Sequence, residues 1–518
     1  MDFSTFDMVF FCGWLLFIMG FGIWISNRNK QETVQDYFLA SKSLPWWAVG
    51  GSLIASNISA EQFIGMSGSG YVVGMAIGAY ELMAALTLIV VAKFFLPIFI
   101  KKEIYTMPQF LEQRFDNRVR TGLAVFWLLL FIFVNITSVL YLGGLALKSI
   151  MDIPLIYGII GLAIFSSTFS IMGGLKAVVW TDLIQVVVLV IGGLIASVMV
   201  LKALGGGVME GLSTLVERAP EKFDMILDKN NPEYKNLPGI SVLIGGMWIA
   251  NLYYWGTNQY IIQRALAAKN LKEAQKGTVF AAFVKILLPL IVVIPGIAAF
   301  VLGADLEKAD EAYPWVLNEY VTTGFKGIAF AALIAAIGSS VSSIVNSAST
   351  IFTLDIYKQI KKDKSEDQKH LVRVGKICSA VCLLLGVLIA PLLGNLDQAF
   401  QYIQEYTGFI SPGVVAIFLL GFFWKRTSAN AALAAVILSI PLSVAFKFLL
   451  PEFPFMDRMG ACFLLIVAIM VVISLIDNKT SDHKAINIEK GLFKTDTVFN
   501  VATVAICGIL AVIYAVWW

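Results

Sequence analysis

The sequence predicts an all-α membrane protein with about fourteen transmembrane helices. Of its 518 residues, 58% are hydrophobic and only 14% are charged, whereas about 25% of the residues in a soluble domain are charged. The mean hydropathy is +0.80. Long apolar runs recur along the whole chain, and a helix that crosses a bilayer needs about 20 apolar residues. The bilayer is therefore the expected solvent for much of the chain.

Fourteen runs meet this length and are predicted to be spanning helices. In chain order they are 4–26, 45–70, 73–99, 121–149, 153–172, 177–203, 239–262, 278–303, 325–357, 374–394, 398–424, 428–449, 457–476 and 496–518. The first run is preceded by Asp2 and contains Asp7, whereas a secretory signal begins with a basic region, so we expect this run to be retained as a helix.

The loops between the runs alternate in charge. One set is rich in Lys and Arg, as around 358–376, whereas the opposite set includes the long acidic loops 204–238 and 304–324. Because cytoplasmic loops carry an excess of positive charge, both chain ends are predicted to face outward, which requires an even number of spans. The net charge of +3 does not indicate nucleic-acid binding.

Residues for enzyme or metal chemistry are scarce. The two histidines, His370 and His483, lie in predicted inward loops, and no metalloprotease, P-loop or Rossmann motif occurs in a usable context. The five cysteines lie in apolar runs, which argues against a disulfide framework. Cys378 and Cys382 share a helix face without further ligands, so a metal site there is not expected. We expect no enzyme activity.

The second span contains a polar break at mid-membrane depth. The segment SNISAEQ at 56–62 interrupts an apolar run, and Gly65, Gly68 and Gly70 follow it. Ser and Asn compete for backbone hydrogen bonds and disfavour a helix interior. We expect the helix to unwind near Asn57, with its freed carbonyls lining an enclosed or water-filled cavity.

The seventh span contains a similar break, NLYYWGTNQ at 251–259. An aromatic belt at the membrane surface is the alternative interpretation. Gly256 with Asn251 and Asn258 favours a broken helix, because a belt does not need residues that break helices. If spans two to six and seven to eleven are inverted repeats, each broken helix opens its repeat, an architecture that places solute and ion sites near the membrane midplane.

The ninth span is rich in hydroxyl groups, with SSVSSIVNSAST at 339–350. Small polar residues also allow close helix packing, which accounts for most of them. Serine hydroxyls that face the freed carbonyls of the second span would form a neutral cage of oxygens. Hard cations prefer oxygen ligands, and a cage without formal charge favours sodium over calcium.

Among the ionisable residues inside predicted spans, Glu81, Asp182 and Lys285 stand out, whereas Lys93 and Lys447 lie close enough to span ends for their side chains to reach the interface. Such residues are costly in hydrocarbon and usually functional. Glu81 and Lys285 either neutralise each other or bind a solute with many hydroxyl groups. The amides of Asn57, Gln62, Asn251 and Gln404 add donors and acceptors, and the aromatic rings of Tyr253, Tyr254 and Trp255 add faces on which a sugar ring can stack.

Three segments are similar to one known family. They are DYFLASKSLPWWAVGGSLIASNISAEQFIGMSGSGY at 36–71, ANLYYWGTNQYIIQR at 250–264 and QAFQYIQEYTGFISPG at 398–413. The chain resembles the sodium:solute symporter family along nearly its whole length. The resemblance implies one transmembrane domain over 1–518 with the leucine-transporter fold of five-plus-five inverted repeats. The repeats would occupy 45–203 and 239–424, with one extra helix before them (4–26) and three after (428–449, 457–476 and 496–518).

The resemblance also implies roles for individual residues. Those expected to contact a sugar are Asn57, Gln62, Glu81, Asn251, Tyr254, Lys285 and Gln404. The expected outer gate is Met66, Tyr80 and Phe400, and the expected inner gate is Tyr253, Tyr254 and Trp255. Sodium is expected to bind the carbonyls of Ala55, Ile58 and Ala336 and the hydroxyls of Ser339 and Ser340, with Asp182 on its exit path.

The function implied is sodium-coupled uptake of a hexose of the galactose or glucose type across a bacterial inner membrane, with sodium as the co-transported ion. Inositol, sialic acid or another carboxylate is the alternative solute, and a sugar sensor or sodium channel of the same fold is the alternative activity. Ala84 stands where the most similar pattern has a serine. The choice among hexoses, the stoichiometry and the oligomeric state stay open at this stage.

Overall fold

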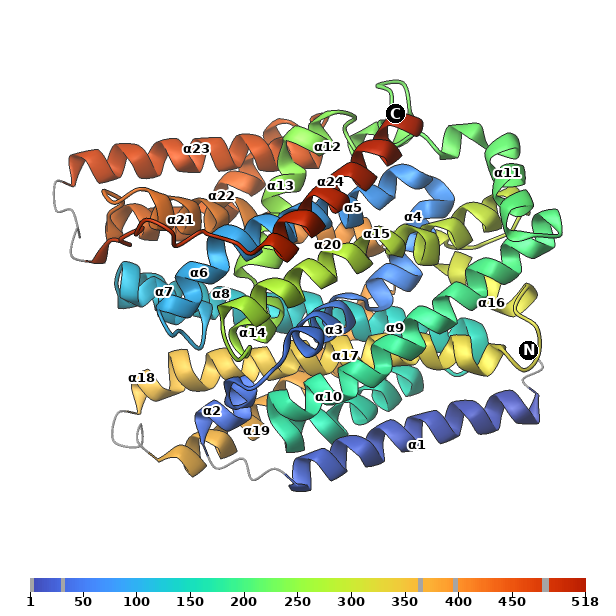
Figure 1. Ribbon diagram of the computed structural model, residues 1–518, viewed down its shortest axis with the longest axis horizontal. Coiled ribbons are helices and arrows are strands. Elements are labelled where there is room, and N and C mark those ends of the chain that lie inside the picture. The colour runs from blue at the N-terminus through green and yellow to red at the C-terminus, as the bar shows by residue number, and fades with distance from the viewer. Residues whose placement is uncertain (1–3, 29–32, 362–366, 395–398, 478–483) are drawn as a thin grey trace.

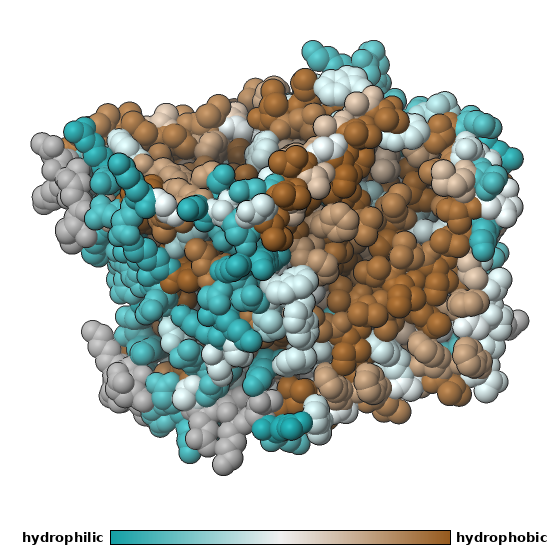
Figure 2. Space-filling view, viewed as in Figure 1, coloured by the Kyte–Doolittle hydropathy of each residue, from teal (hydrophilic) through white to brown (hydrophobic). Residues whose placement is uncertain are grey.

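A computed structural model describes residues 4–28, 33–361, 367–394, 399–477 and 484–518. These residues form helices and connecting loops, and their only extended pairing is an isolated bridge between Leu44 and Ala268. Most of the long helices lie side by side along one direction in Figure 1. Hydrophobic side chains cover much of the face in Figure 2, with polar side chains gathered towards its two ends. This arrangement is that of a protein that spans a bilayer.

Ten helical segments in the described residues are long and apolar enough to cross a membrane. They are α1 (Thr5–Arg28), the segment Met75–Lys101 with α5 and α6, Asn117–Met151 with α8 and α9, Gly173–Gly205 in α10, α15 (Leu271–Val301), Lys326–Ile360 with α17 and α18, Gln368–Leu393 with α19, α22 (Ala429–Leu449), α23 (Phe455–Ile476) and α24 (Thr497–Val516). Each of them falls on a predicted span.

The other four predicted spans fall on helices that are interrupted or short. They are α3 with α4 (Trp46–Asn57 and Ser67–Val72), the first part of α10 (Leu155–Gly205), α13 with α14 (Gly246–Asn251 and Gln259–Leu266), and α20 with α21 (Ala399–Thr407 and Ser411–Phe423). The number of crossings therefore stays a prediction.

The predicted break between the fifth and sixth spans is confirmed, because the two helical parts of α10 meet at a sharp kink at Gly174, inside the predicted connection 173–176. Gly174 makes the kink with φ of +55°, a conformation that suits glycine. A Cβ at this position would also lie 2.5 Å from the carbonyl oxygen of Tyr37.

Short helices connect the longer ones. They are α2 (Val34–Leu39), α7 (Met107–Arg114), α11 (Val208–Arg218), α12 (Ser241–Ile244) and α16 (Ala312–Glu319). The seventh span is correspondingly shorter than predicted, because Ser241–Ile244 forms a separate turn before α13 begins at Gly246.

Both predicted helix breaks are confirmed. The helix α3 ends at Asn57, Ile58 is extended, and a wider π-helical turn begins at Glu61. In the second break, a π-helical turn at Leu252–Thr257 is followed by extended Asn258 before α14 begins. The alternative of an aromatic surface belt is wrong, because Tyr253 and Trp255 are only 0% and 2% exposed.

The helix α17 (Lys326–Ile351) lies at the centre of the bundle. In the segment Lys326–Ile360, 94% of an apolar stretch of 18 residues is buried inside the protein. The corresponding shares are 22% for α1 and 17% for α24. Its serines therefore face other helices rather than lipid, which is where hydroxyl groups in a membrane can find partners.

Candidate solute and cation site

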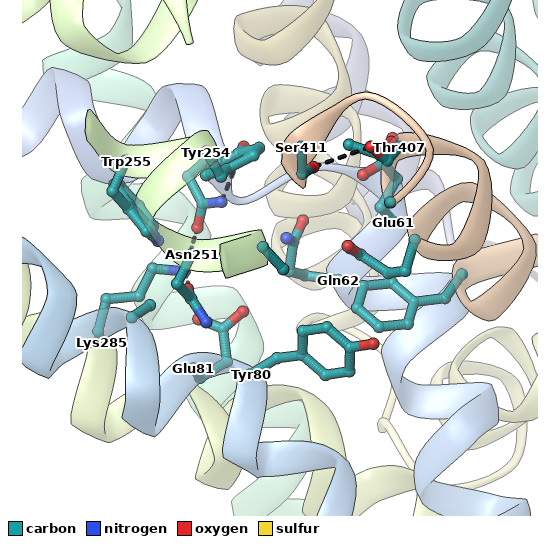
Figure 3. A pocket seen from close by; sticks show the side chains of 16 residues that line it. Glu61, Gln62, Tyr80, Glu81, Asn251, Tyr254, Trp255, Lys285, Thr407 and Ser411 are labelled. Atoms are coloured by element: carbon teal, nitrogen blue, oxygen red, sulfur yellow. Dashed lines mark hydrogen bonds and ion pairs between the residues drawn. The ribbon is translucent and has the colours of Figure 1, made fainter. Parts of the chain in front are cut away.

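A cavity of about 50 Å³, lined mostly by polar residues, lies between the two broken helices (Figure 3). Its lining includes all seven residues predicted to contact the solute: Asn57, Gln62, Glu81, Asn251, Tyr254, Lys285 and Gln404. These residues come from the break after α3, from α5 (Ala79–Val90), α13, the turn after it, α15 and α20. The cavity has room for a few water molecules, so a solute of the size of a hexose would require the surrounding helices to move apart.

A cluster of charged and polar groups lies at one side of this cavity. The ammonium group of Lys285 donates to the carboxylate of Glu81 and to the amide oxygen of Asn57, and it lies 4.9 Å from the centre of the Trp255 ring. Glu81 and Lys285 are 3% and 1% exposed. The pair neutralises its own charge and also lines the cavity, so the two interpretations of these residues do not exclude each other. It presents polar groups without net charge.

Further hydrogen bonds orient the polar groups around the cavity. The amide nitrogen of Asn57 donates to the hydroxyl of Tyr254 at 2.9 Å, and the hydroxyl of Tyr260 donates to the same oxygen at 2.7 Å. The amide oxygen of Gln62 accepts hydrogen bonds from the backbone and hydroxyl of Ser59 at 2.9 and 3.0 Å. Gln62 thus stabilises the break itself while facing the cavity (Figure 3).

Four of the predicted gate residues line the cavity: Tyr80, Phe400, Tyr254 and Trp255. The rings of Tyr80 and Phe400 meet edge to face with 5.2 Å between their centres, as expected of two residues that close one side. Met66 and Tyr253 are fully buried but do not belong to the lining.

Four of the five predicted cation ligands come together: Ala55, Ile58, Ser339 and Ser340. The hydroxyl of Ser339 lies 2.9 Å from the carbonyl oxygen of Ala55, and that of Ser340 lies 3.1 and 3.4 Å from the carbonyl oxygens of Ser56 and Ile58. These carbonyls are available because the coil of α3 ends there. The set contains neutral oxygens alone, which fits a hard monovalent cation. Ala336 lies on the same helix and is buried.

Asp182 lies directly beside this set. Its carboxylate accepts from the hydroxyls of Ser52 at 2.6 Å, Ser339 at 2.5 Å and Ser56 at 3.4 Å. Ser339 therefore contacts both Asp182 and the carbonyl of Ala55. In this position a carboxylate can receive a cation that leaves the neutral oxygens.

Arg264 is a buried residue that lies just beyond the seventh predicted span, 239–262. It is 0% exposed, and its guanidinium donates to the hydroxyl of Ser343 and to the carbonyl oxygen of Tyr260. The hydroxyl of Ser343 lies 3.0 Å from that of Ser56. Arg264 thus joins the aromatic side of the cavity to the serines around Asp182. Extending the helical pattern past the break to Arg264 would have placed it inside the bundle.

Three polar residues of the cavity were not predicted: Glu61, Thr407 and Ser411. Glu61 precedes Gln62 in the break and accepts a hydrogen bond from Ser138 at 3.1 Å. Its position in the polar segment 56–62 could have indicated that Glu61 lines the cavity. Thr407 and Ser411 flank the bend between α20 and α21, which the apolar pattern did not reveal.

Two discontinuous helices around a polar cavity, next to a cluster of neutral oxygens, define a secondary transporter. The family model for the sodium:solute symporter family matches residues 37–439, and the chain belongs to this family.

Named relatives cover most of the chain. The sodium/glucose cotransporter of Vibrio parahaemolyticus is 53% identical over 99% of this chain and 98% of its own length. Sodium/myo-inositol cotransporter 2 of Mus musculus is 36% identical over 83% of this chain and 68% of its own length.

Solved structures agree on the fold. A Na+-coupled sialic acid symporter in a substrate-bound outward-open state aligns with a TM-score of 0.82 and 25% identity, over 92% of this chain and 98% of that one. The nucleobase-cation symporter Mhp1 in a closed conformation aligns with a TM-score of 0.55 and 14% identity, over 86% and 96% of the two chains. The fold is therefore the leucine-transporter type expected from the sequence.

Proposed function

We propose that this protein carries a hexose into the cell together with sodium. The observation that carries the proposal is the polar cavity between the two broken helices, which adjoins a set of hydroxyl and carbonyl oxygens suited to sodium. The relative from Vibrio parahaemolyticus, named for sodium and glucose, supports the same solute class.

Sodium binding would order the segment where α3 ends. Ser340 approaches the carbonyl oxygen of Ile58 across the proposed ion position, and Gln62 caps the same segment through Ser59. A cation held between α3 and α17 therefore favours the conformation in which Gln62 faces the cavity. Sodium and sugar then bind cooperatively, because each stabilises the arrangement that the other needs.

The cavity favours a neutral solute with many hydroxyl groups. Glu81 already neutralises Lys285, which leaves little free charge to attract a carboxylate. Asn57, Gln62 and Gln404 offer both donors and acceptors, and Tyr254 offers a ring face. Myo-inositol is the second candidate, because the relative from Mus musculus that is named for it aligns with 83% of this chain. In addition, Ala84 lines the cavity without a hydroxyl group.

We further propose that both chain ends face outward in a bacterial inner membrane. In Figure 1 the beginning of α1 and the end of α24 both lie in the right half of the bundle. The basic loops lie at the opposite end, which would then face the cytoplasm. The reaction is transport without chemical change of the solute.

Uptake and counterflow in proteoliposomes test the function. We expect labelled galactose or glucose to accumulate only with an inward sodium gradient, and Gln62→Ala to abolish this in inserted protein. Myo-inositol and sialic acid belong in the same panel. Accumulation of sialic acid but of no hexose would reject the hexose assignment, and sugar-evoked current without accumulation would identify a channel or sensor.

A further inference from the structure

A hydrophobic groove of about 460 Å³ runs between α15 and α24 on the outer surface of the bundle. Its lining is Trp46, Lys276, Val279, Phe280, Phe283, Val498, Phe499, Ala502, Ala505 and Ile506. The helices α15 and α24 are in contact (Figure 1), but the small side chains of Ala502 and Ala505 leave the space between them open. Phe283 and Val498 are 48% and 62% exposed. The groove thus opens towards lipid.

The groove has one polar end. Lys276 lies in the second turn of α15, and the groove extends from it to Phe283, a rise of about 10 Å along the helix. On the other wall it starts at Val498, in the first turn of α24. Since half of the hydrocarbon core is about 15 Å thick, this length matches the upper part of an acyl chain in one leaflet.

The ammonium group of Lys276 has no hydrogen-bond or ion-pair partner among the described residues. The acidic groups near it are already engaged: Glu273 accepts from the backbone of Trp46 at 2.7 Å, and Asp496 caps α24 and lies 3.7 Å from Lys272. No carboxylate among the described residues therefore lies within ion-pair distance of Lys276, and its ammonium group at the mouth of the apolar groove is open to a further anion. Its complement is a phosphate attached to a hydrocarbon chain.

Trp46 forms the other side of the mouth. Its ring meets Phe280 edge to face at 5.7 Å between centres, and its backbone packs on Gly277, where a Cβ would lie 2.6 Å from the carbonyl oxygen of Trp46. Partly exposed tryptophans are typical of the boundary between headgroups and acyl chains. The start of the broken helix α3 and the second turn of α15 therefore meet at this mouth.

We propose that the groove binds one anionic phospholipid, with its phosphate at Lys276 and an acyl chain along Phe280, Phe283 and Ala502. The lipid comes from the leaflet at the basic end of the protein. It contacts α24, a peripheral helix, and also α15 and α3, which carry Lys285 and Asn57 of the cavity. Its occupancy is thus linked to the helices that form the transport site.

The test is native mass spectrometry of the full chain with phosphatidylglycerol or phosphatidylcholine. We expect one phosphatidylglycerol to be retained about fivefold more tightly than phosphatidylcholine. Lys276→Gln removes this preference, whereas the control Lys369→Gln, at an exposed lysine outside the groove, keeps it. Soluble glycerol phosphate does not displace the lipid.

A second variant tests the apolar groove independently of the charge of Lys276. Ala505→Trp fills the groove and leaves Lys276 in place, so we expect it to lower retention of both lipids. Unchanged preference in Lys276→Gln, unchanged retention in Ala505→Trp, or displacement by glycerol phosphate would each overturn the proposal. None of these outcomes depends on sugar transport.

Discussion

Ser340 illustrates how a single hydroxyl acquires a role through the break in a neighbouring helix. It lies on the buried helix α17, and its partners are the carbonyls of Ser56 and Ile58, which an unbroken α3 would have used internally. The hydroxyl of Ser342, by contrast, bonds within its own helix to the carbonyl of Ser339 at 2.8 Å. Two buried serines two positions apart thus differ in what they contact.

We expect Ser340→Ala to raise the sodium concentration needed for half-maximal uptake about tenfold, because a neutral oxygen ligand is lost. Ser342→Ala is the matched control and should leave sodium dependence unchanged. Sugar uptake measured against sodium concentration in proteoliposomes checks both variants. A Ser340→Ala protein with the sodium dependence of the wild type would remove this residue from the cation site.

The pair of Glu81 and Lys285 allows stability and transport to be separated. Removing one member of a buried ion pair costs about 3–5 kcal/mol, whereas replacing both is often tolerated. We expect Lys285→Met alone to lower both the melting temperature and uptake. The double variant Glu81→Gln, Lys285→Met should recover most of the thermal stability but not uptake. Recovery of hexose uptake in the double variant would show that the pair serves only to neutralise itself.

Arg264 gives a third prediction at the level of one residue. Its planar guanidinium donates to Ser343 and to the backbone of Tyr260, and an ammonium group cannot reproduce this fork. We expect Arg264→Lys to insert and fold but to lose most sodium-coupled uptake. Arg118→Lys, in which the parent side chain is 58% exposed, is the control. Equal uptake in the two variants would limit Arg264 to a structural role.

At the scale of elements, the breaks in the second and seventh spans could be predicted because Asn, Ser and Gly stand inside apolar runs. The break at 173–176 could also be predicted, but one glycine among apolar residues does not show whether the chain forms a kink or a longer loop there. The same limit hid the bend between α20 and α21. Periodicity reports the face that an element buries, not the angle at which two helices meet.

The helix α20 carries Phe400 and Gln404, and it also carries Glu405, which forms ion pairs with two neighbouring helices. The carboxylate of Glu405 lies 2.8 Å from the guanidinium of Arg458 on α23 and 3.3 Å from the ammonium of Lys447 on α22. These contacts tie the predicted outer gate to helices outside the repeats. Opening of the gate by movement of α20 would have to strain or break them.

We therefore expect Glu405→Gln to shift the protein towards its outward-open form. In a background without the native cysteines, Thr407→Cys should react about fivefold faster with a thiol reagent added outside when Glu405→Gln is present. Glu452→Gln is the control, because Glu452 pairs with Lys235 in an exposed loop. A labelling rate that Glu405→Gln leaves unchanged would show that these ion pairs do not hold the gate.

At the scale of the whole molecule, the seven predicted solute contacts converge because each lies at a polar exception to the membrane pattern. Arg264 was not predicted to belong to the site, because it lies near the end of an apolar run and does not interrupt one. A cation near the end of a run looks like a loop residue, and only the packing of α14 against α17 brings it into the bundle. The positions of Thr407 and Ser411 likewise depend on a bend that involves contacts distant in sequence.

If the protein has the single cation site proposed here, that site limits the sugar gradient that the transporter can sustain. A membrane potential of 100 mV contributes about 2.3 kcal/mol per charge, and a tenfold sodium gradient adds about 1.4 kcal/mol. One sodium per hexose then sustains a sugar gradient of roughly five-hundredfold, whereas two sodium ions would sustain the square of that ratio. We expect accumulation in tightly sealed proteoliposomes, with the potential set by potassium and valinomycin, to rise about fiftyfold per 100 mV, as one charge per sugar requires. A slope of two charges per sugar would require a second cation site beyond Ser339, Ser340 and the carbonyls of α3, and Ser340→Ala measured in the same vesicles would show whether one of the two ions depends on this set.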